Sequence, residues 1–66
     1  MKNNLRVERA IKNITQEELA RSIGVTRQAI NSIELGKYVP STVLALKLSR
    51  YFNKAVNDIF TLEETD

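Results

Sequence analysis

Four polar side chains in the middle of the chain could hydrogen-bond to the edges of nucleic-acid bases. They are Arg27, Gln28, Asn31 and Ser32. On a helix these positions share one face, which here lies opposite Ile30 and Ile33. Arginine can bond guanine O6 and N7 together, and an amide can bond adenine N6 and N7. Taken alone, the same face is typical of any solvated helix surface, so its meaning depends on the elements around it.

The stretch Thr15–Gly36 predicts two short helices joined by a tight turn, and the second helix carries this polar face. A T-x-x-E capping box at Thr15 begins the first helix. Gly24 ends it, because such a turn often needs a residue at positive φ. Thr26 then caps the second helix. So short a connection makes the helices cross steeply, and the residue near the crossing must be small, as Ala20 is.

The spacing of apolar residues predicts three further helices. They run from about Leu5 to Asn13, from a Ser41 cap to about Phe52, and from about Val56 to Ile59. In the first of them, Val7 and Ile11 are expected to supply the buried face and to leave Glu8 outside it. We therefore expect one all-α domain over residues 1–66, with a core from 5 to 60, a two-helix unit at 16–35 and an acidic tail at 63–66.

The segment after Phe60 has three possible arrangements. Residues 61–63 could be extended and pair with residues 2–4, or they could pair with a second subunit. A frayed tail is the alternative that needs no partner.

Composition excludes several classes of protein. The 66 residues include no cysteine and no histidine, which excludes disulfides and the usual zinc sites. A chain of this length buries only about 60% of its unfolded surface, so a dimer is reasonable on stability grounds. No apolar run is long enough for a signal peptide or a membrane span, so we expect a cytoplasmic location and no membrane partner.

Charge is unevenly distributed along the chain. The net charge is +2, but three of the eight acidic residues lie in the last four positions, so residues 1–62 carry +5. A basic body with a short acidic tail is compatible with a polyanionic partner and also with an ordinary solvated surface.

These features together resemble the helix-turn-helix family of phage repressors and Cro, in its branch of small bacterial regulators. The resemblance runs from Leu5 to Phe60, and the stretches that carry it are TQEELARSIGVTRQAINSIELGKYVPS and NDIF. It implies a five-helix, lambda-repressor-like fold that binds operator DNA, usually as a two-fold dimer. The two-helix unit is then the helix-turn-helix, and its second helix is the recognition helix.

The resemblance also implies roles for single residues. Arg27 and Gln28 match the first turn of the recognition helix, which reads bases, and Asn31 and Ser32 are secondary candidates. Gln16 matches a glutamine that binds a DNA phosphate and braces the recognition helix. Its alternative is a surface residue with no role beyond helix propensity.

Two residues after the recognition helix match positions that contact the phosphate backbone. They are Lys37 and Tyr38. Lys37 could equally serve the helix dipole, and Tyr38 could cover the edge of the core. Leu35 departs from the family pattern, because several relatives have a polar residue there that contacts the backbone.

Two structural features follow from the same resemblance. Arg9 and Glu34 match an internal ion pair between the first helix and the end of the recognition helix. A C-terminal dimer patch is expected from Val56, Ile59, Phe60 and Leu62. The alternative for the patch is burial within one chain, above all for Ile59.

The resulting hypothesis is a sequence-specific DNA-binding transcriptional regulator, a repressor that binds a near-palindromic operator as a homodimer. The alternative is an antitoxin or another protein-interaction module with the same fold. Nothing in the sequence supports an enzyme. We expect no metal, no cofactor and no small-molecule ligand.

Overall fold

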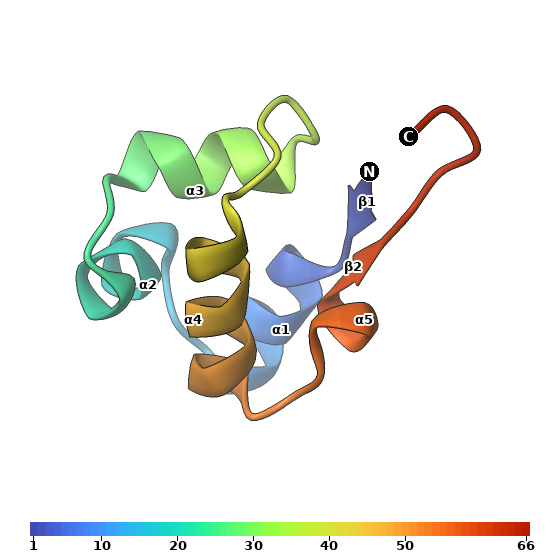
Figure 1. The fold of residues 1–66 in the computed structure, drawn as a ribbon. Coiled ribbons are helices and arrows are strands. Elements are labelled where there is room, and N and C mark those ends of the chain that lie inside the picture. Colours follow the sequence, from blue (N-terminus) through green and yellow to red (C-terminus); the bar gives the residue numbers. More distant parts are fainter.

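The computed structural model describes residues 1–66 and contains five helices and a small two-stranded sheet (Figure 1). The helices are α1 (Leu5–Lys12), α2 (Gln16–Ile23), α3 (Arg27–Glu34), α4 (Thr42–Phe52) and α5 (Val56–Ile59), and the strands are β1 (Lys2–Asn3) and β2 (Phe60–Thr61). In Figure 1, α3 lies across the top of the molecule and both chain ends lie on one side of it. No helix is long and apolar enough to cross a membrane. The predicted all-α fold is confirmed.

Side-chain caps begin three of the helices where the sequence predicts them. Thr15 Oγ1 accepts from the Glu18 N–H at 3.0 Å, and the Glu18 carboxylate accepts from the Thr15 N–H at 3.0 Å. Thr26 and Ser41 each accept from the N–H three residues further on, both at 3.1 Å. These bonds satisfy N–H groups that have no partner inside the helix, so they fix where α2, α3 and α4 begin.

Residues in the left-handed conformation end α1, α2 and α4. Gly24 has φ +87° at the end of α2, which allows α3 to begin after so short a link. Asn53 ends α4 at φ +54°, since asparagine tolerates this region better than most residues do. Ala55, before α5, makes no side-chain cap bond, and α5 is only four residues long.

Eleven buried apolar residues form one core. They are Leu5, Leu19, Ala20, Ile23, Ile30, Ile33, Leu44, Leu48, Phe52, Ile59 and Phe60. All five helices contribute, and α2 and α3 pack most extensively against each other. The core therefore fixes α3 on the domain through Ile30 and Ile33 and leaves its other face to solvent.

The predicted buried face of α1 is wrong. Val7 and Ile11 are 55% and 67% exposed, whereas Leu5 and Glu8 are buried. Glu8 tolerates burial because Lys54 Nζ lies 3.0 Å from its carboxylate. The 3.6-residue period correctly predicts a helix, but the inward face carries a charge whose partner comes from the turn after α4.

The sheet joins the two ends of the chain. β1 and β2 are antiparallel, with Lys2 opposite Thr61 and Asn3 opposite Phe60. This confirms pairing with the N-terminal segment of the same chain, although the paired residues are 60–61 and not 61–63. Asn3 also donates through Nδ2 to the Ile33 carbonyl at 2.8 Å. The N-terminal strand thus holds the C-terminal end of α3.

Candidate nucleic-acid interface

The polar face predicted on α3 is present and lies at the surface. Arg27, Gln28 and Asn31 are exposed and Ser32 is half-buried. Successive helical positions divide this face into two flanks. Arg27 and Asn31 share the flank toward the start of α2, and Gln28 and Ser32 share the flank toward the loop after α3.

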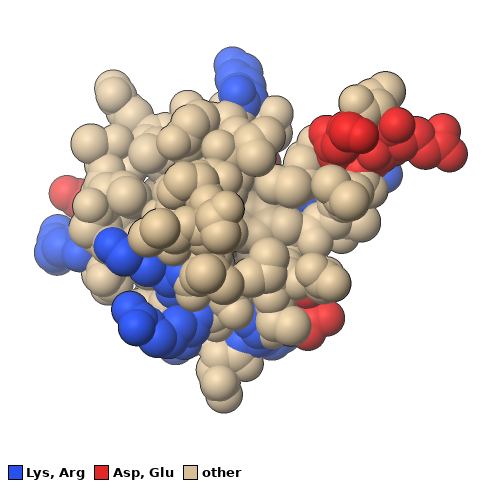
Figure 2. Space-filling model, viewed as in Figure 1, with Lys and Arg blue, Asp and Glu red and all other residues tan.

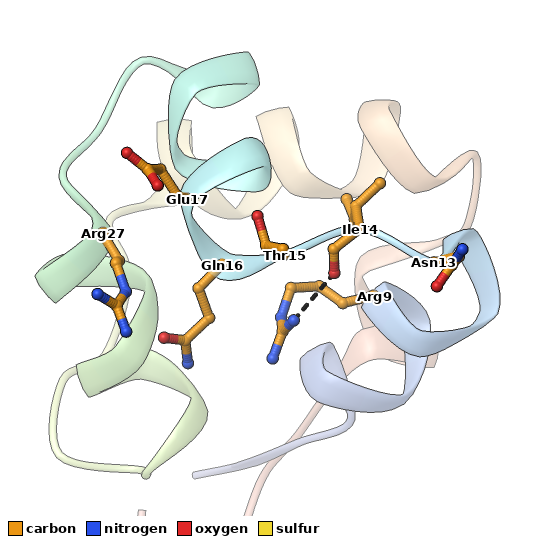
Figure 3. Close-up of a pocket in the computed structure, with 7 residues that line it drawn as sticks. All are labelled: Arg9, Asn13, Ile14, Thr15, Gln16, Glu17 and Arg27. Carbon is orange, nitrogen blue, oxygen red and sulfur yellow. Dashed lines mark hydrogen bonds between the residues drawn. The ribbon is translucent and has the colours of Figure 1, made fainter.

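A hollow that we call the α2 recess lies on the first flank (Figure 3). It has a volume of about 470 Å³ and is lined by Arg9, Asn13, Ile14, Thr15, Gln16, Glu17 and Arg27. Figure 3 shows Arg9, Gln16 and Arg27 reaching into the same space from α1, α2 and α3. The start of α2 forms one wall, so free backbone N–H groups accompany these side chains.

A second hollow, the loop groove, lies on the other flank of α3. It has a volume of about 310 Å³ and is lined by Thr26, Gln28, Ala29, Ser32, Lys37 and Tyr38. Lys37 and Tyr38 are both exposed. Two of the predicted base-reading residues therefore share a groove with the two predicted phosphate ligands of the loop.

Arg9 and Glu34 form an ion pair between α1 and the last turn of α3. Arg9 Nε and Nη2 donate to the two carboxylate oxygens of Glu34 at 2.5 and 3.0 Å. The two side chains are 15% and 5% exposed. This two-point geometry resists rotation of either group and fixes the end of α3 relative to α1. Arg9 Nη1 also donates to the Ile14 carbonyl at 3.0 Å (Figure 3).

The environment of this pair shifts both groups toward their charged forms. Burial alone would raise the pKa of Glu34, but the hydrogen bonds from Arg9 and Gln16 and the nearby positive charges outweigh it, and the pKa lies below its usual value. The hydrogen bond to Glu34 raises the pKa of Arg9 against the opposing effect of burial.

Gln16 connects this ion pair to the polar face of α3. Its Nε2 donates to Glu34 Oε1 at 3.1 Å and to Asn31 Oδ1 at 3.1 Å. The family resemblance predicts a bracing role for Gln16 but does not identify Asn31 as its partner. The spacing of fifteen residues between them crosses the turn, so no local pattern reveals the contact.

The C-terminal dimer patch stays a prediction, but the structure buries two of its four residues within one chain. Ile59 and Phe60 are 1% and 6% exposed and belong to the core, because α5 packs against α4 and β2 packs against α5. Val56 is half-buried. Leu62 alone is well exposed, at 77%.

A different apolar surface is open to solvent beside these residues. Val39, Val43 and Leu46 are 59%, 63% and 57% exposed. Val39 and Leu46 line a groove of about 260 Å³ whose floor includes Val56 and Phe60. We call these three exposed residues and this groove the α4 apolar face. The i, i+3 spacing of Val43 and Leu46, outside the buried positions of the helix, was the signal available in the sequence.

Charges are separated in space as they are in sequence. Figure 2 shows the acidic side chains of the C-terminal tail projecting together at the upper right, and most of the visible basic side chains lie elsewhere on the body. Glu63 and Asp66 are held near the chain start, where each lies within 3.2 Å of the Met1 amino group. The ion pairs of the tail are therefore with the N-terminal amino group and not with Lys or Arg side chains of the body.

Comparison with known proteins decides the family. Residues 5–59 match the helix-turn-helix family. The chain belongs to this family, in its phage repressor and Cro type. A helix-turn-helix-type transcriptional regulator of Methanocaldococcus jannaschii is 48% identical over the full length of both chains. The regulator YgzD of Bacillus subtilis is 47% identical over 97% of each chain.

Solved structures give the same assignment for this helix-turn-helix chain. The transcriptional repressor LexA of Eubacterium rectale matches with a TM-score of 0.82 and 32% identity, over 96% of this chain and 67% of that one. Members of the family are DNA-binding transcriptional regulators and not enzymes. The α3 face, the α2 recess and the loop groove are therefore the candidate DNA interface.

Proposed function

We propose that this regulator recognises a specific DNA sequence by placing α3 in the major groove. The observation that carries the proposal is the outer face of α3, where Arg27, Gln28 and Asn31 are exposed and free of core packing. Arg27 and Gln28, in the first turn, read bases, and Asn31 and Ser32 add contacts further along. The inner face is fixed by Ile30 and Ile33, so the readers are presented on a rigid element.

Phosphate contacts on both sides of α3 set its position in the groove. The α2 recess offers the N–H groups at the start of α2, with Gln16 as the first residue of that helix. The loop groove offers the ammonium of Lys37 and the hydroxyl of Tyr38. Two hollows on opposite flanks of one helix suit the two phosphate strands that border a major groove.

The regulator acts as a homodimer on a near-palindromic operator. The α4 apolar face supports this step, because it exposes three large apolar side chains close to the loop that follows α3. A two-fold axis there would place two recognition helices about 34 Å apart, one turn of DNA. Val56 and Leu62 would contribute at the rim, with Ile59 and Phe60 supporting them from the core.

Repression is the proposed outcome of binding. A bound dimer blocks a promoter by occupancy and needs no further contact to do so. LexA of Eubacterium rectale is described as a repressor, whereas BcrR of Enterococcus faecalis, 36% identical over 80% of this chain, is described as an activator. A reporter gene placed behind the selected operator distinguishes repression from activation, since only repression lowers its expression when the protein is present.

Selection of bound duplexes from a random pool, followed by sequencing, tests the proposed function. We expect one enriched near-palindrome. Arg27→Ala should lower the discrimination between that sequence and a mutated one by about 10- to 100-fold, because each two-point base contact contributes about 1–3 kcal/mol. Full discrimination by Arg27→Ala would remove Arg27 from the base-reading set.

The second candidate is an antitoxin or another protein-interaction module. The α4 apolar face favours it as well, since an exposed apolar surface can receive an unrelated protein. The same selection separates the candidates: a pool with no enriched sequence would reject the DNA-reading function and leave the interaction module.

A further inference from the structure

A chain of hydrogen bonds runs from α1 to the surface of the recognition helix. Arg9 donates to Glu34, and Gln16 Nε2 donates both to Glu34 Oε1 and to Asn31 Oδ1, each at 3.1 Å. This series of hydrogen bonds begins at Arg9 and Glu34, whose side chains are 15% and 5% exposed, and it ends at the exposed Asn31. The buried end is therefore rigid, and the end that can meet DNA is oriented by it.

The carboxylate of Glu34 fixes which way both amides point. Arg9 holds Glu34 ionised, and an ionised carboxylate only accepts hydrogen bonds. The atom of Gln16 that faces Glu34 must then be the amide nitrogen. The same nitrogen lies 3.1 Å from Asn31, so the atom of Asn31 that meets it must be the carbonyl oxygen. The orientations of the Gln16 and Asn31 amides are therefore both fixed.

This arrangement leaves Asn31 with its donor directed outward. Its Oδ1 already accepts from Gln16 and is held toward α2, so Nδ2 is the group best placed to bond to a base in the major groove. An asparagine that reads adenine uses its oxygen for N6 and its nitrogen for N7 together. Here the bond from Gln16 occupies one lone pair of that oxygen and holds it toward α2, which weakens the adenine contact. Guanine presents two adjacent acceptors, O6 and N7, adenine and thymine present one acceptor each, and cytosine presents only the N4 donor. A lone NH2 group suits guanine best and cytosine least.

We propose that Asn31 selects guanine at one operator position because Gln16 holds its amide nitrogen toward the major groove. Asn31 is the specificity-determining residue, and Gln16 is a positioning residue that acts through it. The inference rests on the proposed function, since it requires α3 to lie in the major groove. It corrects the adenine preference that an unconstrained asparagine would have.

The experiment selects DNA from a random pool with the full chain, with three test variants and with one control variant. Asn31→Ala identifies the operator position at which base preference is lost. At that position the original chain should prefer guanine by about 10-fold, the scale of one good base contact. Asn31→Asp keeps the size of the side chain but presents an acceptor outward, so preference should move to cytosine or adenine, whose exocyclic amines donate.

The third variant tests the positioning role. Gln16→Met keeps the length of the side chain and removes both donated bonds, so guanine preference at that one position should fall while the rest of the operator is retained. Asn57→Asp, at an exposed position on α5, is the matched control for the added charge and should leave the preference unchanged.

The outcomes are distinct. Guanine preference that survives Asn31→Asp, or an original preference for cytosine, overturns the inference even if an operator is found. Guanine preference unchanged in a folded Gln16→Met overturns the positioning role. If that variant fails to fold by circular dichroism, the Asn31→Asp result alone decides. A pool without any enriched sequence overturns the proposed function, and this inference with it.

Discussion

At the scale of single residues, two charged pairs connect elements that sequence analysis treats separately. Arg9 and Glu34 hold the end of α3 to α1, and Glu8 and Lys54 hold α1 to the turn after α4. Both carboxylates are nearly inaccessible, with side chains 5% and 6% exposed. Buried pairs of this kind add little net stability, but removing one partner is costly because the other charge stays buried.

The Glu34 carboxyl makes stability depend on pH. Its pKa is lower in the folded protein than the ordinary value of 4.5, so the unfolded chain binds more protons and stability rises with pH in this range. The contribution is fully present above that ordinary value and is lost as the pH falls through the lowered folded pKa. Glu34→Gln should therefore show a smaller loss of stability than the original chain from roughly pH 5 to pH 3.

Urea denaturation at a series of pH values measures this difference, with circular dichroism at neutral pH as the control for folding. The same acid slope in both proteins would show that Glu34 titrates with an unshifted pKa.

Replacing one partner of the Glu8–Lys54 pair should lower the stability of the protein, whereas replacing both partners should not. Lys54→Met leaves the Glu8 carboxylate buried without its partner, and we expect a loss of about 1–3 kcal/mol, since Lys54 is 43% exposed and water can replace it in part. Glu8→Leu with Lys54→Met removes both charges and should be at least as stable as the original chain. Chemical denaturation of the single and double variants measures the two values. A double variant less stable than Lys54→Met alone would contradict this account.

At the scale of elements, the sequence predicted what depends on neighbours in the chain. The caps at Thr15, Thr26 and Ser41 and the turn at Gly24 are local, because each involves residues at most four positions apart. Contacts between segments far apart in the sequence are harder to predict from it. Glu8 was placed outside the core because Lys54, 46 residues away, is invisible to a helical period.

The interface shows the same division. The face of Arg27, Gln28, Asn31 and Ser32 followed from helical geometry, and the structure brings these residues to the surface of α3. The Gln16–Asn31 bond and the α4 apolar face did not follow, since the first crosses a turn and the second requires knowing what α5 and β2 cover.

The turn between α2 and α3 can be tested through its glycine. A Cβ added at Gly24 would meet nothing within 4 Å, so Gly24→Ala tests backbone strain alone. With φ at +87°, the cost should be about 1–2 kcal/mol, the penalty of the left-handed region for an ordinary residue. Thermal or urea unfolding gives the value. Replacing glycine at an ordinary φ can raise stability. If Gly24→Ala keeps or raises the free energy of unfolding, the turn does not hold this left-handed conformation.

At the scale of the whole molecule, function depends on how one small domain presents two surfaces. α3 carries the polar face, and the α4 apolar face begins only a few residues later in the chain. Residues 1–62 carry +5, and the acidic tail projects away as a group (Figure 2). Attraction to DNA is therefore expected to weaken steeply with salt, as for any protein that displaces counterions from phosphates.

The α4 apolar face gives the prediction that separates dimer from monomer. Leu46 is 57% exposed, so Leu46→Glu should leave the fold intact while placing a charge in the proposed contact. We expect this variant to sediment as a monomer and to lose about 100-fold or more in affinity for the full operator, because joining two half-site contacts multiplies their strength. Its affinity for an isolated half-site should be unchanged, since Leu46 lies outside the candidate DNA interface.

Val7→Glu, at a comparably exposed apolar residue on α1, is the matched control and should behave as the original chain does. If Leu46→Glu remains dimeric with full operator affinity, the second copy does not bind at α4.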